Sequence, residues 1–339
     1  MNHQSCTCFI VPPKMLRHLA DRTTGAERDA LVDSMLLTEH LRGFRAARQM
    51  TLLANSAGEK RRTVYNCHHA QSTPPHGKLV RAEGDPPSAD ATVNEAYDST
   101  GTTYDFYQKV LNRNSVDAKG MRLDSFVHYG RGYNNAFWDG AEMTFGDGDG
   151  KLFLGFASAL DVVAHELTHG VTQFTVPGGL DYVDQSGALN ESISDVFGSV
   201  VKQWKLGQSV DQADWLIGPG IMAPAVGQAL RSMKDPGNPA ITWTHDDQPK
   251  TMTAYVQGGD VHTNSGIPNH AFFLAATGIG GNSWDQAAHI WYTALPLLTS
   301  NATFADAAKA TIQTAGNLYG PASSEQTAVE GAWREVRVI

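Results

Sequence analysis

Two histidines and a glutamate stand close together where the chain reads His165-Glu166-Leu167-Thr168-His169. Residues four apart lie on the same face of an α-helix, so both imidazoles can reach one tetrahedral Zn²⁺. Glu166 would then lie close enough to take a proton from a water molecule on that metal. Because so short a pattern also arises by chance, the alternative is a pair of surface histidines. The surrounding sequence decides between the two.

The residues on either side of this motif predict a largely buried helix. Apolar side chains recur at steps of three and four, as on one buried helix face, at Leu160, Val163, Leu167, Val171 and Phe174. The Pro-Gly-Gly run at 177–179 ends the pattern. We therefore expect a helix over about 160–174 that carries both histidines along one edge.

A catalytic zinc needs a third protein ligand and one open position. Glu191 and Asp195 are four residues apart in the segment 187–198, whose apolar residues predict a second helix with a buried side. We expect Glu191 to be the third ligand. Asp195 would accept a hydrogen bond from a ligand histidine and so fix its tautomer. The alternative is an acidic helix face in contact with solvent.

With these residues in place, the sequence resembles the thermolysin family of zinc metallopeptidases, from about residue 62 to the C-terminus. The resemblance rests on separated motifs in a fixed order, around the zinc motif, at 133–138, 146–150, 161–164, 187–198, 230–233 and 262–266. It implies an α+β, two-lobed zincin fold. The N-lobe would be β-rich, the C-lobe mostly helical, and the zinc helix would form the floor of the cleft between them.

The resemblance also implies a zinc-dependent neutral endopeptidase. Glu166 would activate a zinc-bound water as general base and then protonate the leaving amine as general acid. His262 and Tyr182 would donate hydrogen bonds to the oxyanion, a contribution worth about 3–4 kcal/mol per donor.

Substrate binding is assigned by the same resemblance. Asn135 and the carbonyl of Ala136 would hold the peptide backbone, and Arg231 would bind a substrate carbonyl. Cleavage is expected before bulky hydrophobic residues, because a pocket beside Arg231 would be lined by three apolar side chains, Val162, Ile217 and Leu230.

Two departures from the family pattern affect these assignments. The spacer from the second zinc histidine to Glu191 is about two residues longer than is usual, and we expect the extra residues, at 176–179, to form a surface turn just before Tyr182. The family also has an Asp five residues before the active-site histidine, where this chain has Gln257. Asp260 is the residue that we expect to orient His262 instead.

A third departure concerns calcium. The carboxylate positions of the family's paired calcium site correspond to Asp161, Lys202, Asp214 and Pro219 here, so two of the four are lost. Calcium prefers six to eight oxygen ligands, mostly anionic. We expect Lys202 to neutralise Asp161 and Asp214 in place of Ca²⁺. The alternative is an exposed lysine on a solvated face.

Composition fits a two-lobed globular enzyme of 339 residues, with 41% hydrophobic and 18% charged residues. The net charge of −9 and a pI near 5.8 argue against nucleic acid or an anionic membrane as partners. No apolar run approaches the roughly 18 residues that span a bilayer. We expect a monomer whose partners are peptide or protein substrates and its own propeptide.

Residues 1–51 read as a short, basic, helix-rich propeptide, followed by catalytic lobes at 52–159 and 160–339. The stretch 8–16 resembles the propeptide signature of the protealysin-like branch of the family, although Lys14 departs from it. We expect self-removal of the propeptide by a cut between Gln49 and Leu53, where apolar residues adjoin a polar, exposed stretch.

Three cysteines, an odd number, do not make a disulfide framework. Cys6 and Cys8 are too close to pair easily, and Cys67 stands apart. Either Cys8 binds the zinc and silences the precursor, or it is an inert buried thiol. The first 20 residues lack an ordinary secretory signal, so we expect secretion by a non-classical route, with a cytoplasmic protein as the alternative.

Secondary structure is predicted more coarsely elsewhere. Strands are expected at 63–65 and 125–129, with one helix near 104–112 between them. Beyond Gly187 the chain should be mostly helical, with helices at 264–277 and 284–298. Thr303 with Asp306, and Ser323 with Gln326, should open the last two helices.

Two other classes of protein compete with this interpretation. A zinc aminopeptidase uses a similar metal motif but needs an acidic site for the free amine of its substrate, and Asn135, Arg231 and His262 fit internal cleavage better. A non-catalytic zinc protein is disfavoured because Glu166 is present and a structural zinc has four protein ligands.

Overall fold

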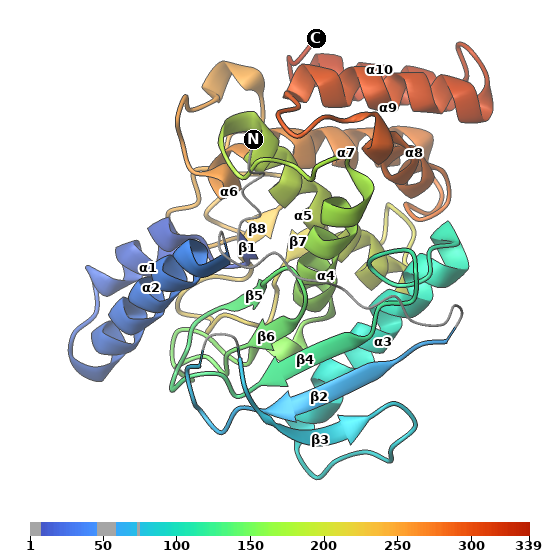
Figure 1. The fold of residues 1–339 in the computed structure, drawn as a ribbon. Helices are drawn as coiled ribbons and strands as arrows, with labels where there is room; N and C mark the ends of the chain where they lie inside the picture. The colour runs from blue at the N-terminus through green and yellow to red at the C-terminus, as the bar shows by residue number, and fades with distance from the viewer. Residues whose placement is uncertain (1–7, 46–58, 73–74) are drawn as a thin grey trace.

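The computed structural model describes residues 8–45, 59–72 and 75–339. Its N-lobe is built on one mixed six-stranded sheet in the order β1-β5-β6-β4-β2-β3 (Figure 1). The strands are β1 (Cys8–Phe9), β2 (Arg62–Asn66), β3 (Lys78–Ala82), β4 (Leu123–Val127), β5 (Ala136–Trp138) and β6 (Met143–Phe145). The parallel pairs are β2 with β4 and β4 with β6. The two predicted strands correspond to β2 and β4.

Helix α3 (Ala91–Leu111) packs against this sheet, with contacts to β2 and β4. It begins well before the predicted helix near 104–112, because the carboxylate of Asp90 accepts hydrogen bonds from the backbone N–H groups of Thr92 and Val93. The prediction was wrong about its start because Gly101 and the threonines at 100, 102 and 103, which are weak helix formers, lie in the middle of the helix just before the predicted start.

Two long helices join the lobes. Helix α4 (Leu160–Thr175) is the predicted zinc helix, and α5 (Asp184–Leu206) is the predicted second helix. They pack closely where α5 has Gly198, because a Cβ atom there would lie 2.7 Å from the carbonyl oxygen of Asp161. The turn between them contains Gly178 and Gly179 with φ of +83° and +72°, a conformation that glycine adopts without strain.

The C-lobe is mostly helical, as expected. After the short pair β7 (Leu216–Ile217) and β8 (Arg231–Ser232) come α6 (Val261–Asn264), α7 (Gly266–Ile279), α8 (Gln286–Ala294), α9 (Phe304–Tyr319) and α10 (Ser324–Glu335). The predicted helix at 284–298 is shorter, since η3 (Leu295–Leu297) contains a proline and tightens into a 3₁₀ turn. The capping box of Thr303 and the cap of Ser323 are confirmed. Among the described residues no helix is long and apolar enough to cross a membrane.

The described part of the predicted propeptide, called the leader below, comprises β1, α1 (Pro13–Ala20) and α2 (Gly25–Arg45). It lies beside the edge of the sheet that β5 provides (Figure 1). Its apolar side chains belong to the core of the whole molecule: Ile10, Val11, Met15 and Leu16 are completely buried. Cys6 and the predicted cut between Gln49 and Leu53 lie outside the described residues.

His18 of α1 lies where the leader meets the body of the protein. Its ring centroid is 3.7 Å from that of His245, and its Nδ1 accepts a hydrogen bond of 2.9 Å from Arg22, which requires a neutral ring. Burial lowers the pKa of His18; His245, Arg22 and Lys14 lower it further, while Asp21 acts in the opposite direction. His18 therefore binds fewer protons in the docked leader than in the undocked leader.

The sign of this shift predicts that acid loosens the leader. Docking should be fully favourable above a pH of about 6.5, the ordinary value for histidine, and should weaken as the pH falls below it. Hydrogen exchange of the α1 amides, corrected for intrinsic rates, should be faster at acid than at neutral pH. His18→Gln should flatten this dependence, whereas the matched change His289→Gln on α8 should not. Equal pH dependence in His18→Gln would contradict the assignment.

Candidate active site

Three buried side chains from α4 and α5 converge on one point. The Nε2 atoms of His165 and His169 lie 3.0 Å apart. Oε2 of Glu191 lies 3.4 Å from Nε2 of His165, and its Oε1 lies 3.6 Å from Nε2 of His169. All three side chains are at most 1% exposed. Two imidazole nitrogens and a carboxylate are the donor set of catalytic zinc sites.

Hydrogen bonds on the far side of each imidazole fix which nitrogen faces this point. Asp195 Oδ1 lies 2.8 Å from Nδ1 of His165, as predicted, and Asn190 Oδ1 lies 2.8 Å from Nδ1 of His169. Glu191 Oε2 is buried with no hydrogen-bond partner in the part of the chain that the structure describes. This oxygen does lie 3.4 Å from Nε2 of His165 and 3.3 Å from Nε2 of His262. Because a buried carboxylate oxygen without a hydrogen bond is costly, the residues present fit a bound zinc ion.

Three polar residues of the site were not predicted from the sequence. Asn190 and Ser194, one turn apart on α5, both contact Nδ1 of His169. Asn269 of α7 donates a hydrogen bond of 2.8 Å to Asp195 Oδ2. The spacing of four between Asn190 and Ser194, beside the predicted ligand, was an available signal. Asn269 is far away in the sequence and carried none.

Glu166 points from α4 towards the end of β5. Its Oε2 accepts a hydrogen bond of 3.0 Å from the backbone N–H of Trp138, and its Oε1 is buried without a hydrogen-bond partner among the described residues. Burial raises the pKa of Glu166 well above the ordinary value for glutamate. One oxygen is therefore anchored and the other is available for a proton.

Asp195 connects His165 to Arg231. The Nε and Nη2 atoms of Arg231 donate bidentate hydrogen bonds of 2.8 Å to the Asp195 carboxylate, and both side chains are buried. Burial alone would raise the pKa of Asp195, but Arg231 and His165 outweigh it and hold that pKa well below its usual range. The same carboxylate thus orients a predicted metal ligand and a predicted substrate-binding cation.

His262 lies on α6, on the other side of Glu191. Its Nδ1 lies 2.9 Å from Asp260 Oδ1, which also caps α6 by accepting the backbone N–H of His262. The hydroxyl of Tyr182 donates a hydrogen bond to Glu191 and lies 3.4 Å from Nε2 of His262. The structure therefore brings Tyr182, His262 and Asp260 to the predicted place, and Gln257 is exposed.

The leader extends the sheet across this site as strand β1, antiparallel to β5. The amide of Ile10 donates to the carbonyl of Ala136 at 3.3 Å. The side chain of Asn135 binds Val11 at both ends, accepting from its N–H at 3.0 Å and donating to its carbonyl at 3.2 Å. Both residues predicted to hold a substrate backbone thus hold the backbone of the leader.

Two further carbonyls of the leader meet predicted catalytic groups. Arg231 Nη1 donates to the carbonyl of Ile10 at 3.0 Å, and Nε2 of His262 lies 2.7 Å from the carbonyl oxygen of Phe9. Backbone pairing with a sheet edge is a common mode of peptide recognition. The leader therefore occupies the site in the manner of an extended peptide.

Lys202 occupies the place predicted for it. Its Nζ lies 3.0 Å from carboxylate oxygens of both Asp161 and Asp214 and donates to the carbonyl of Leu216 at 2.7 Å. Burial would lower the pKa of Lys202, but Asp161 and then Asp214 outweigh it and raise that pKa. The lysine side chain is 11% exposed and that of Asp161 only 2%, so this pair is buried.

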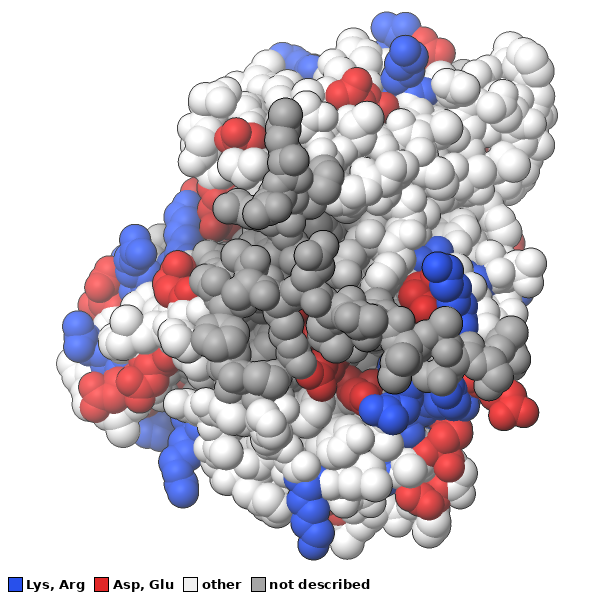
Figure 2. Space-filling view, viewed as in Figure 1, with Lys and Arg blue, Asp and Glu red and all other residues white. Residues whose placement is uncertain are grey.

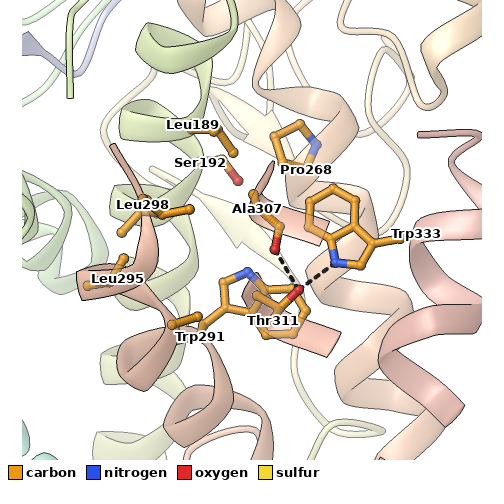
Figure 3. Close-up of a pocket in the computed structure, with 11 residues that line it drawn as sticks. Leu189, Ser192, Pro268, Trp291, Leu295, Leu298, Ala307, Thr311 and Trp333 are labelled. Atoms are coloured by element: carbon orange, nitrogen blue, oxygen red, sulfur yellow. Dashed lines mark hydrogen bonds between the residues drawn. The ribbon is translucent and has the colours of Figure 1, made fainter. Parts of the chain in front are cut away.

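A separate cavity is lined by Leu189, Ser192 and Ile193 of α5 and by none of the zinc ligands (Figure 3). At about 20 Å³ it has room for roughly one water molecule. Apolar side chains from α5 and the C-terminal helices line most of it, and Trp333 Nε1 donates to Thr311 Oγ1 at 2.8 Å. This cavity is a packing feature and too small for a peptide.

Charged side chains are mixed on the surface. On the face in Figure 2, Lys and Arg alternate with Asp and Glu among the described residues, and no broad basic area is visible there.

The fold and the site together define a zinc-dependent metallopeptidase. The chain belongs to the thermolysin family: the family descriptions "Thermolysin metallopeptidase, catalytic domain" and "Thermolysin metallopeptidase, alpha-helical domain" match residues 47–173 and 178–338. The predicted family and the two-lobed α+β fold are confirmed. Members of this family are neutral zinc endopeptidases.

Similar proteins cover nearly the whole chain. An "Extracellular metalloprotease" of Pectobacterium carotovorum subsp. carotovorum is 45% identical over 98% of this chain and 96% of its own length. "Protease PrtS" of Photorhabdus sp. (strain Az29) is 39% identical over 97% and 91%. The solved structure "Precursor of Protealysin, Metalloproteinase from Serratia proteamaculans" has a TM-score of 0.87 and 42% identity, covering 98% of this chain and all of that one. The chain therefore has the precursor form.

Proposed function

We propose that this chain is the latent precursor of an endopeptidase that cuts internal peptide bonds before bulky hydrophobic residues and removes its own leader. The observation that carries this proposal is the binding of the leader backbone by Asn135, Ala136, Arg231 and His262. These contacts involve only backbone atoms of the leader, so an unrelated extended peptide can make them.

In the proposed reaction, the carbonyl that His262 contacts is the one that is attacked. His165, His169 and Glu191 would hold a zinc ion, which would supply Lewis acidity and lower the pKa of a water molecule. Glu166 takes the proton of that water on its available Oε1 and passes it to the leaving amine. His262, with Tyr182 beside it, donates to the developing oxyanion.

The remaining residues position these groups. Asp260 holds the His262 ring, and Asp195 holds His165 and Arg231 at once. Arg231 binds the carbonyl of the residue that follows the attacked bond, the position that Ile10 takes in the leader. Asn135 and the carbonyl of Ala136 keep the chain extended. Fixed geometry of this kind contributes by orienting the reacting atoms.

Side-chain preference is proposed to come from the pocket of Val162, Ile217 and Leu230. All three are at most 1% exposed. Burying a large apolar side chain there contributes about 1.5–3 kcal/mol, a preference of roughly tenfold to a hundredfold. The residue that presents its carbonyl to Arg231 in the leader, Ile10, is itself apolar and completely buried.

The proposal predicts the new termini produced from a complex peptide mixture. Mass spectrometry of the digest should give new amino termini dominated by Leu, Ile, Phe and Val, and amino-blocked peptides should be cut as well as free ones. Leu230→Ala should shift the preference towards larger aromatic residues, while the exposed matched change Leu206→Ala should not. Termini dominated by charged residues, or no cleavage of blocked peptides, would contradict the proposal.

We further propose that the mature enzyme acts outside the cell. The support is the name of the Pectobacterium relative, an extracellular metalloprotease that aligns along nearly its whole length. We also propose that the leader is residues 1–51 and that the two catalytic lobes meet near residue 160, where α4 begins.

A further inference from the structure

We propose that Cys8 is a fourth ligand of the zinc ion in the precursor, so that its thiolate closes the metal site until the leader departs. The inference rests on the zinc site of the proposed function. The first support is the direction of the side chain. Phe9 packs against Phe137 with ring centroids 5.4 Å apart, in an aromatic cluster on one side of the sheet. Side chains alternate along a strand, so Cys8 points to the opposite side, and β1 contacts α4.

The second support is the position of the sulfur. Ligand atoms of Cys8, His169 and Glu191 all lie within 4.8 Å of one another, and the three residues are buried. This is the one group of three or more metal-ligating residues of this kind among the described residues. In a tetrahedral site with bonds of roughly 2.0–2.3 Å, ligand atoms lie roughly 3.3–3.8 Å apart, so these three atoms approach one another by up to roughly 1–1.5 Å on binding an ion. His165 is not in this group, so the Cys8 sulfur also moves towards His165 when all four residues bind one ion.

An independent observation points to a ligand at the same place. Glu191 Oε2 is fully buried and has no hydrogen-bond partner among the described residues, and Nε2 of His165 faces Nε2 of His169 at 3.0 Å. These atoms are aimed at a common cation. With Glu191 as the anionic ligand, a Zn²⁺ ion leaves one positive charge in a buried site. A thiolate from Cys8 neutralises that charge, and sulfur is a preferred zinc ligand.

Zinc binding by Cys8 also explains why a peptide bond of the leader is not cut although it lies in the active site. The peptide bond between Phe9 and Ile10 lies directly before an apolar residue, Ile10. The carbonyl oxygen of Phe9 lies 2.7 Å from Nε2 of His262, and Arg231 binds the carbonyl of Ile10. These are the proposed positions of a bond about to be cut. Four protein ligands leave no open position for the hydrolytic water, as in structural zinc sites. The chemistry is then blocked at the metal while the backbone of the leader is bound like a substrate.

Cys67 supplies the matched comparison within the same chain. It is also buried, in the aromatic cluster of Phe9 and Phe137, and burial raises the pKa of its thiol to about 12. It belongs to no metal-ligating group among the described residues. Cys67 is therefore an inert thiol, the role that Cys8 would have if the inference were wrong.

The test is X-ray absorption at the zinc edge of the full-length Glu166→Gln precursor, which keeps its leader. We expect one sulfur neighbour at roughly 2.3 Å beside nitrogen and oxygen neighbours at roughly 2.0–2.2 Å. The sulfur neighbour should be lost in Glu166→Gln/Cys8→Ser and retained in Glu166→Gln/Cys67→Ser. The parent measurement needs no cysteine variant, so it stands even if Cys8→Ser folds poorly.

The outcomes separate this inference from the proposed function. A precursor with one zinc ion per chain and only nitrogen and oxygen neighbours overturns the role of Cys8 and leaves the endopeptidase proposal intact. A precursor that binds no zinc overturns both. A sulfur neighbour that persists in the Cys8→Ser variant assigns the sulfur to another residue and overturns the inference as well.

Discussion

Replacing Glu166 by Gln lowers kcat on an internally cut peptide by about 10²–10⁴, while one zinc ion stays bound. The amide keeps the size of the side chain and can still meet the backbone N–H of Trp138, which now holds Glu166 at 3.0 Å. It cannot accept and carry a proton. The measurement is steady-state turnover with metal analysis of the same sample. Near-normal turnover would refute the assigned base.

The same change should leave the precursor at full length, because the proposed maturation is carried out by the enzyme itself. A trace of wild-type enzyme added to the Glu166→Gln precursor should restore cutting if one molecule can process another. The amino terminus of the product should fall between residues 49 and 53. Maturation of pure Glu166→Gln precursor at the wild-type rate would mean that an outside protease makes the cut.

Replacing Lys202 by Ala is expected to cost about 3–5 kcal/mol in the free energy of unfolding, since it leaves the buried carboxylate of Asp161 without its cation. Asp161 lies in the first turn of the zinc helix, and Lys202 is its ion-pair partner at 3.0 Å. Denaturant unfolding of the two proteins measures the difference. Lys205→Ala, one turn further along α5 and exposed, is the matched control and should change stability little.

A second experiment tests whether Ca²⁺ binds at the site of Lys202, Asp161 and Asp214. If Lys202 replaces Ca²⁺ at the family's paired site, a calcium-selective chelator should leave Tm unchanged while zinc is retained. A cluster of two carboxylates and one ammonium group has far too little negative charge for a pair of divalent ions. A loss of many degrees on chelation would show that calcium binds there.

The residues that carry out the chemistry were easier to predict from the sequence than the residues that hold them in place. His165, His169 and Glu191 were predictable because spacings of four on amphipathic helices fix which side chains share a face. Lys202 was predictable for a similar reason, as it lies about three turns after Glu191 on the same helix. Contacts between distant segments were not predictable. Asn269 donates a hydrogen bond to Asp195, which is 74 positions away in the sequence, and no local pattern indicates this contact.

The structure of the leader also depends on distant contacts that the sequence does not reveal. Strand β1 is only two residues long and exists because β5 supplies its hydrogen-bond partners, so no alternating pattern could reveal it. Helix α1 begins at Pro13, in a stretch whose resemblance to a propeptide signature gave no secondary structure. The start of α3 was missed because Asp90 forms its cap in a segment of weak helix formers.

Because β1 pairs with β5 through its backbone, occupancy of the cleft by the leader depends on the local concentration of that strand. While the leader is attached, its strand faces the cleft at an effective concentration on the order of millimolar, whatever the dilution of the protein. One cut turns it into an ordinary dissociable peptide. At micromolar enzyme the local supply of that peptide falls by about a thousandfold with every contact unchanged. A tethered strand can therefore close the cleft, and one hydrolysis of the tether is enough to let the strand leave it.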